Sequence, residues 1–410
     1  MATNGVTGAL RALAFSAALV AVWLAASVAP VSAASTIDFL AALSDSEMDE
    51  FRAWKDARNV FNDRTDAYWD AVEAKRQGRR KKRAAKIPFE PTDYVMSLAP
   101  KYTGPTLSAE LAKKYYSFVE RQKTAEPAQQ RELATVADYL EAAKRVYNFT
   151  PERVSEREFK QRYAEEAHAL GLSKEQVVRV YALETGGNGT YDMQSGIHPI
   201  KKTGRAISSA LGYAQLLDAN SINELARSGD TFISLLNRKL RDPENTPERT
   251  AALKRKLAVL KRMYANVKRL PFEWSVQQRY AKTDNGMGIH TLNIDADIGP
   301  MLQAMKLRTL KDTAAKQGRR SLTGAELELM NLAGPMTGLK MMEEPGASAP
   351  TTNFFARRAY YVNKMVNGLT GAELQVELDR RMTQSITRPG AQEFAEAFDR
   401  LYARRSTAER

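Results

Sequence analysis

Cysteine is absent from this chain of 410 residues. Its absence excludes disulfides, thiolate zinc sites, thiol nucleophiles and a lipid-modified cysteine behind a signal segment. Histidine is rare too, and the three that occur, His168, His198 and His290, are far apart in the sequence. We therefore expect surface or hydrogen-bonded core positions for them and no His-rich metal site. Nothing else in the sequence indicates a metal or a cofactor, and we expect neither.

Alternating strand patterns of valine and isoleucine are scarce, whereas apolar residues recur at three- and four-residue spacings along most of the chain. Apolar residues make up 43% and charged residues 27%, which is typical of a soluble globular protein and excludes a wholly disordered chain. The sequence therefore predicts a mainly α fold. Helices are expected over 37–86 and within 107–148, as two helices broken at 171–173 over 155–185, and as a helix pair or one broken helix over 207–228. Further helices are expected over 247–268, 294–316, 324–333, 353–367 and 371–383.

Long apolar runs are missing except at the start of the chain. Arg11 is the only charge in the first 33 residues, and residues 12–29 are apolar or small. A small-x-small cleavage site, Val31-Ser32-Ala33, follows. We interpret residues 1–33 as a removable signal for export, with an uncleaved membrane anchor as the alternative.

Acidic residues are outnumbered: 48 Asp and Glu stand against 61 Lys and Arg, which gives a net charge of +13. An exported basic protein is expected to meet anionic polymers of a cell envelope, lipid headgroups or extracellular nucleic acid. The densest basic run, Arg76 to Lys86, is typical of a solvated linker or helix end, with a polyanion anchor as the alternative. No aromatic-basic pattern or reader motif accompanies it, so we do not expect nucleic acid as the partner.

One carboxylate lies in an unusual place. In "YALETGGNG", residues 181–189, Glu184 ends a helix that a capping box, Ser173 to Gln176, begins. Spacing puts Glu184 on the same face as Val177 and Tyr181. Burial and the carbonyl end of a helix both disfavour a charged acid, so we expect a raised pKa at Glu184. A carboxyl group still protonated near neutral pH is what glycosidic cleavage needs, and the glycines that follow leave room for a bulky polymer.

Five short segments, taken in order, resemble the motifs of the lytic transglycosylases of the lysozyme-like superfamily. "ETGGN" at 184–188 resembles E-S-G-G-N, and "ALGYAQLLDANS" at 210–221 resembles G-L-M-Q-L-M-P-A-T. "LNIDADIGPMLQAMKLR" at 292–308 is similar to N-I-x-A-G-x-x-Y-L-x-x-L, and "LMNLAGPMTGL" at 329–339 to A-Y-N-A-G-P-G. "YVNKMV" at 361–366 matches the closing Y-V-x-K-V helix.

This resemblance implies a lysozyme-like fold and a role for each matched residue. Glu184 would be the single acid and base that cleaves the bond between N-acetylmuramic acid and N-acetylglucosamine and leaves a 1,6-anhydro product. The substrate-binding residues would be Thr185, Tyr213, Gln215, Asn331 and Tyr361, with Tyr213 stacking on a sugar ring. The partner would be peptidoglycan, and the location the periplasm.

The resemblance also implies a division of the chain. We expect a helical N-terminal region over 34–150 with a basic, proline-containing linker, a lysozyme-like domain over 151–370 and a helical tail over 371–410. The stretch between Gln215 and the segment at 292 is longer than in the family, so a basic helical insertion is expected at about 230–290.

Departures from the family pattern leave alternatives open. Ala214, Asp218 and Met330 replace a methionine, a proline and a tyrosine of the family. They favour, as the main alternative, a non-catalytic or weakly active peptidoglycan-binding or scaffold protein. Ordinary hydrolysis would need a second carboxylate, for which Asp192 is the nearest candidate, although a loop-capping role is the more common use of such a residue.

Overall fold

The computed structural model describes residues 38–125 and 133–408. These residues are mainly helical and contain no strand longer than isolated β-bridges, which confirms the predicted mainly α fold. Within this part of the chain, no helix combines the length and the apolar character that a membrane crossing requires. The expected signal segment, 1–33, lies outside the described residues.

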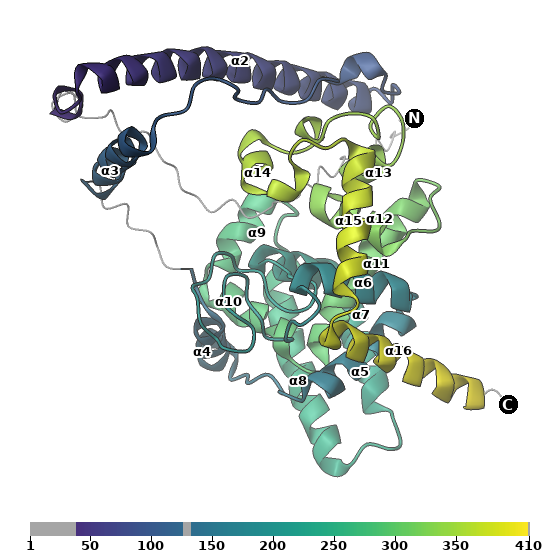
Figure 1. Ribbon diagram of the computed structural model, residues 1–410. Coiled ribbons are helices and arrows are strands. Elements are labelled where there is room, and N and C mark those ends of the chain that lie inside the picture. Colours follow the sequence, from purple (N-terminus) through teal and green to yellow (C-terminus); the bar gives the residue numbers. More distant parts are fainter. Residues whose placement is uncertain (1–37, 126–132, 409–410) are drawn as a thin grey trace, which may run out of the picture. The chain divides into compact units, whose positions relative to one another are not determined.

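Most helices are joined by short connections (Figure 1). The α-helices are α2 Asp45–Ala84, α3 Ala109–Ala125, α4 Val136–Tyr147, α5 Glu156–Ala169, α6 Lys174–Thr185, α7 Asp218–Leu240, α8 Pro247–Val267, α9 Trp274–Ala281, α10 Asp284–His290, α11 Ile298–Lys316, α12 Gly324–Ala333, α13 Pro335–Met341, α14 Arg357–Val362, α15 Gly371–Ser385 and α16 Pro389–Ala408. Four 3₁₀ turns join them: η1 Pro91–Asp93, η2 Thr291–Ile294, η3 Thr351–Asn353 and η4 Lys364–Val366. A long loop separates α6 from α7, and another separates α2 from α3.

The described residues form two compact units. Unit 1 comprises 38–125 and 340–374, and unit 2 comprises 133–339 and 375–408. This division differs from the expected one. Residues 340–374 belong with the N-terminal helices and not with the segment that precedes them, and the C-terminal tail belongs to unit 2.

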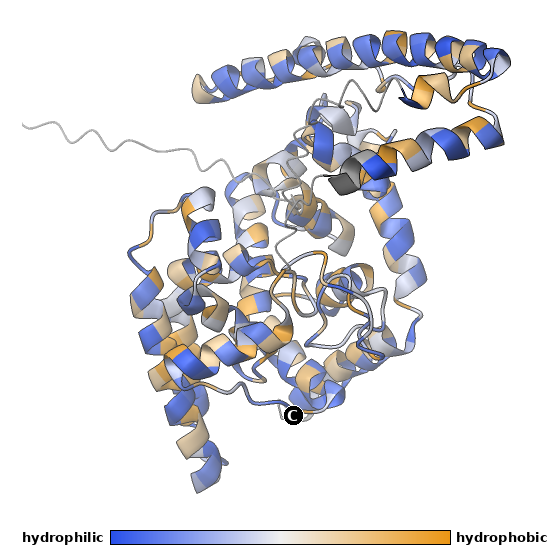
Figure 2. Cartoon of the chain, turned by 90° about the vertical axis from the view of Figure 1, so that its left-hand side faces the viewer, coloured by the Kyte–Doolittle hydropathy of each residue, from blue (hydrophilic) through white to orange (hydrophobic). Residues whose placement is uncertain are grey.

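Unit 1 is built around α2, which is hydrophilic along most of its length (Figure 2). Its beginning is fixed by a capping box between Ser44 and Glu47. A small aromatic cluster joins this end of α2 to α3, with Phe39 stacked on Phe118 at 4.7 Å and edge-on to Phe51 at 5.4 Å. The apolar side chains at this end of α2 and α3 therefore pack in a small aromatic cluster and not in a large core.

The basic run of α2 has an inner and an outer face. Arg79 is 5% exposed and donates to the carbonyl oxygens of Asp93 at 2.7 Å and Asn353 at 2.6 Å. Arg76 donates to the carbonyl oxygen of Phe355, and Lys82 pairs with the carboxylate of Asp93 at 2.6 Å. The spacing i, i+3, i+6 puts these three cations on one side of the helix. The run is therefore not a linker, because its inner face holds the loops of unit 1.

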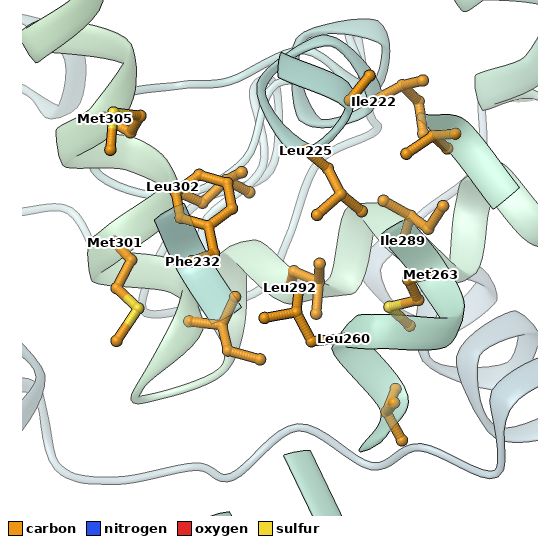
Figure 3. Close-up of a cluster of buried hydrophobic side chains, with 14 of the residues drawn as sticks. Ile222, Leu225, Phe232, Leu260, Met263, Ile289, Leu292, Met301, Leu302 and Met305 are labelled. Carbon is orange, nitrogen blue, oxygen red and sulfur yellow. The ribbon is translucent and has the colours of Figure 1, made fainter. Parts of the chain in front are cut away.

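A large part of the core of unit 2 is a cluster of buried side chains that are mostly aliphatic or sulfur-containing (Figure 3). Phe232 from α7, Leu260 from α8 and Leu302 from α11 are all fully buried in it. As the sequence predicted, Leu253, Leu260 and Val267 of α8 point inward. The expected insertion is therefore an integral part of this core. The predicted basic back of α8 is exposed and consists of Lys254, Arg255, Lys261, Arg262 and Lys268.

Two predicted helices have different bounds. The helix expected over 207–228 begins only at Asp218, because Gly212 and Gln215 adopt positive φ angles of 74° and 41° that interrupt helical hydrogen bonding. The helix expected over 353–367 is reduced to α14, which ends where Asn363 becomes extended. By contrast, the predicted starts at Ser173, Thr246 and Thr323 are all confirmed as N-caps.

A buried ionic cluster joins α8 to the start of α11. Asp295 and Asp297 are fully buried, and Lys256 of α8 contacts them at 3.1 and 2.6 Å. Burial opposes ionisation of Asp297, but the hydrogen bond from Arg249 and the attraction of Lys256 outweigh it and hold the pKa of Asp297 well below its usual range. This cluster fixes α11 from one end.

Lys256→Met should destabilise unit 2, because it leaves two buried aspartates without their central cation. Breaking a buried ion pair costs about 3–5 kcal/mol. Urea denaturation at pH 7 should show a loss of this order in the free energy of unfolding. Lys254→Met, on the exposed side of the same helix, is the matched control and should change stability little; equal effects of both variants would contradict the role of the cluster.

Candidate active site

Glu184 lies in the last turn of α6, as the sequence predicted. The helix ends at Gly186, whose φ of +63° is left-handed, and Thr185 donates through its hydroxyl to the carbonyl oxygen of Tyr181 at 2.7 Å. Thr185 therefore satisfies one of the free carbonyls at the helix end. Glu184 as a whole residue is partly exposed, and its carboxyl group faces α12.

The two glycines after Glu184 have different surroundings. A Cβ at Gly186 would meet nothing within 4 Å, so this position is open. A Cβ at Gly187 would lie 2.3 Å from the backbone oxygen of Ser385, because the turn between α15 and α16 packs against it. Of the two glycines, only Gly186 leaves the open space that we predicted for a polymer. Gly187 is required for close packing within unit 2.

Helix α12 packs against α6 and brings two polar side chains to Glu184. The Asn331 amide donates to Glu184 Oε1 at 3.2 Å and reaches Glu328 Oε1 at 3.3 Å and Oε2 at 3.4 Å. The same amide nitrogen thus brings the carboxyl groups of Glu184 and Glu328 close together. We call Glu184 and Glu328 the carboxyl pair.

The carboxyl pair holds protons more tightly than ordinary glutamates. Burial raises the pKa of Glu184 to about 7, against the opposing effects of the hydrogen bond from Glu328 and the positive charge of Lys306. Glu328 is only 2% exposed, and burial together with the adjacent charge of Glu184 raises its pKa well above the usual range. Two acids in contact cannot both ionise readily, so the pair retains at least one proton near neutral pH.

Other charged groups face the carboxyl pair from two helices. Lys306 of α11 attracts both acids of the pair and also Glu224 of α7. Burial lowers the pKa of Lys306, whereas these acids raise it. Glu224 is 3% exposed, its Oε2 has no hydrogen-bond partner, and burial raises its pKa against the attraction of Lys306 and Arg227. Three acids thus face two cations, and the acids are incompletely neutralised.

Two predicted sugar contacts are turned toward the protein. Tyr213 is 1% exposed, its ring packs edge-on against Tyr181 at 4.7 Å, and its hydroxyl donates to the carboxylate of Glu156. Stacking of this ring on a sugar is therefore wrong for this structure, because no ring face is open. Gln215 is partly exposed, but its side-chain amide donates to the carbonyl oxygen of Gly212 at 2.8 Å within its own turn.

Tyr361 belongs to unit 1 and not to the unit that carries Glu184. Its hydroxyl accepts a hydrogen bond from the indole Nε1 of Trp69 at 3.2 Å, and the residue is 43% exposed. Of the five predicted substrate-binding residues, Asn331 alone contacts Glu184 through its side chain; Thr185 is its neighbour in the chain.

Asp192 is engaged within its loop. It pairs with Lys202 at 2.9 Å and with Arg153, and it accepts from the Thr190 hydroxyl at 2.7 Å. Burial opposes ionisation, but the hydrogen bonds from Lys202 and Thr190 keep the pKa of Asp192 below its usual range. Asp192 therefore stabilises its loop and is not a catalytic partner of Glu184. The second carboxylate beside Glu184 is Glu328, which sequence reasoning missed although it precedes Asn331 by three residues on one helix face.

The histidines have the structural roles expected of them. His290 is fully buried, with Nδ1 2.8 Å from the Ser221 hydroxyl and Nε2 2.7 Å from the Ser209 carbonyl oxygen. His198 Nδ1 accepts from the backbone N–H groups of Ile200 and Lys201. Across the described ranges, no three or more His, Asp or Glu side chains gather in a way that could hold a metal ion.

Comparison with known proteins adds no relative: no family model matches the chain, and no curated protein or solved structure matches it significantly. The chemistry of the site therefore has to be argued from its own geometry. A partly exposed acid with a raised pKa, held by an amide and backed by a second buried acid, can deliver a proton to a bound group near neutral pH.

The raised pKa of Glu184 predicts a pH-dependent effect on stability. Because the folded protein binds this proton more tightly than the unfolded chain, stability falls as pH rises from about 4.5 toward about 7. Glu184→Gln removes this loss, so its free energy of unfolding relative to wild type should be higher at pH 8 than at pH 4, by about 3 kcal/mol. Urea denaturation at both pH values measures this.

The control for this experiment is Glu396→Gln, on the exposed face of α16, which should show the same relative stability at both pH values. A Glu184→Gln variant that behaves like this control would mean that Glu184 is an ordinary solvated acid.

Proposed function

We propose that this protein is an exported peptidoglycan lytic transglycosylase with a lysozyme-like fold in unit 2 and Glu184 as its acid and base. The observation that carries the proposal is the hydrogen bond of 3.2 Å between Asn331 and Glu184. These residues are 147 positions apart, and each was selected from the sequence as the polar centre of a different motif. Two residues that were matched to the family independently are therefore hydrogen-bonded to each other.

Two further motif segments connect to this centre within unit 2. The segment at 292–308 supplies Lys306, whose charge acts on Glu184. It also supplies Gln303, whose side chain accepts from the backbone N–H of Ala214 at 3.0 Å and so ties the 210–216 turn to α11. The four motif segments of unit 2 are therefore linked by contacts and are not merely consecutive in the chain.

The proposed reaction uses Glu184 twice. Its proton passes to the oxygen that links N-acetylmuramic acid to the next sugar while the bond from C1 to that oxygen breaks. The resulting carboxylate then takes the proton of the muramic 6-hydroxyl as O6 bonds to C1, which closes the 1,6-anhydro ring and returns Glu184 to its protonated form. No water is consumed, so one acid and base is sufficient.

The charge of the protein suits this substrate. The exposed basic residues of α2 and α8 would attract anionic polymers of the cell envelope, which would concentrate the enzyme at the wall. Partial exposure of Glu184 and the open position at Gly186 leave the acid within reach of a ligand.

A binding or scaffold role is the second candidate, and the burial of Met330 and Tyr213 favours it. The chain carries Met330, fully buried, where the family has tyrosine, and Tyr213 offers no ring face. A site with fewer aromatic surfaces for sugar rings would lose catalysis more readily than it loses binding of the polymer.

Digestion of purified sacculi tests the proposal. The chain beginning at Ala34 should release muropeptides with 1,6-anhydro ends, identified by mass spectrometry. Glu184→Gln should lower the rate by about 10²-fold or more, because it removes a general acid. Glu326→Gln on α12, which keeps the capping-box geometry, is the matched control and should digest at the wild-type rate.

Three results separate the candidates. Reducing ends in place of anhydro ends would identify ordinary hydrolysis. Sacculus binding without released muropeptides, unchanged by Glu184→Gln, would identify the scaffold role. Equal digestion by wild type and Glu184→Gln would exclude Glu184 as the acid.

A further inference from the structure

Glu328 is a buried acid to which a one-carboxylate mechanism gives no role. It is 2% exposed, it lies on α12 against α6, and it shares the amide of Asn331 with the proposed acid Glu184. A buried acid without a role would be expected to give way to an apolar or amide side chain, since burial of a carboxyl group costs free energy.

The geometry around Glu328 fits a neutral carboxyl group better than an ionised one. The Asn331 amide approaches both acids from one side, at 3.2 Å from Glu184 and 3.3 Å from Glu328. Two acids that share one amide donor in a largely buried place repel each other when both are ionised, so a proton on one of them stabilises the arrangement. Glu184 is partly exposed whereas Glu328 is buried, so the proton that stays behind belongs on Glu328.

The remaining charges around the pair do not replace this proton. Lys306 on α11 is the cation that acts on both acids, and it is shared with Glu224 on α7. Arg227 on α7 acts on Glu224 and repels Lys306. Two cations therefore face three acids, and a proton within the carboxyl pair completes the balance of charge.

We propose that Glu328 is a positioning residue that keeps its own proton throughout the reaction and donates it as a hydrogen bond to the carboxylate of Glu184. This inference rests on the proposed function for its catalytic meaning. When Glu184 has protonated the leaving sugar oxygen, its new negative charge is stabilised by the Glu328 hydroxyl and the Asn331 amide. When Glu184 removes the proton of the 6-hydroxyl, it becomes neutral again and no longer needs this stabilisation. The proton of Glu328 stays on Glu328 throughout.

Two substitutions separate this role from a structural one. Glu328→Gln keeps a neutral donor, so the alkaline limb of the pH profile for muropeptide release should stay at the wild-type pH. Glu328→Leu removes the donor, which makes ionisation of Glu184 harder, so the alkaline limb should move up by about one pH unit and the maximal rate should fall about tenfold or more. A merely structural role would lower the rate without moving the limb.

A downward shift of the alkaline limb in Glu328→Gln would overturn the inference, because it would mean that the substitution removed a negative charge that is present in wild type. An unshifted limb in Glu328→Leu would overturn it too, since Glu184 would then not depend on the Glu328 donor.

Infrared spectroscopy of the same proteins in D₂O tests the pair without any enzyme activity. At pH 9, above the pKa of Glu184, wild type should show the absorption band of a protonated buried carboxyl group, and this band should be lost in the difference spectrum of Glu328→Gln against wild type. If this band is present but sacculi yield no muropeptides, the proposed function fails while the proton-holding role of Glu328 stands. If muropeptides are released but the band is absent, the role of Glu328 is wrong and the proposed function stands.

Discussion

The packing of α6 against α12 removes water from two glutamates at once, and the proposed chemistry depends on this one constraint. Each carboxyl group would ionise fully in water at neutral pH. Burial raises the pKa of both acids, the charge of Glu184 raises that of Glu328 further, and the Asn331 amide contacts both carboxyl groups. The helix end after Glu184 and the open position at Gly186 then leave one acid of the pair accessible.

The acids of unit 2 that are removed from water have pKa values shifted in two opposite directions. Asp297 is fully buried, yet Arg249, Lys256 and Lys239 surround it and its pKa is low. Glu184 and Glu328 share Lys306 with Glu224, and their pKa values are high. The number of neighbouring cations, not burial alone, therefore decides whether an acid serves structure as a permanent anion or serves chemistry as a proton donor.

Local features of the fold could be predicted from the sequence, because capping boxes and proline starts involve only four neighbouring residues. The starts at Ser173, Thr246 and Thr323 are examples. The start of α7 could not, since the turn before it depends on Gln303 of α11, which holds the backbone of Ala214. The membership of residues 340–374 in unit 1 likewise depends on Arg76 and Arg79, whose partners are about 275 residues away in the chain.

Some residues of the candidate site could likewise be predicted from the sequence, and others could not. Glu184 and Asn331 could be found from motifs, and Glu328 could have been found from its three-residue spacing to Asn331. The surroundings of Tyr213 could not, because an aromatic residue in a loop has the same sequence pattern whether it faces a ligand or the tyrosines of neighbouring helices.

The central claim is that the carboxyl pair keeps a proton at neutral pH while Glu184 stays accessible. Neutron crystallography at pH 7 after exchange into D₂O would show this most directly. The account predicts nuclear density for a deuteron on Glu328, directed at an oxygen of Glu184. Two bare carboxylates in that map would contradict it.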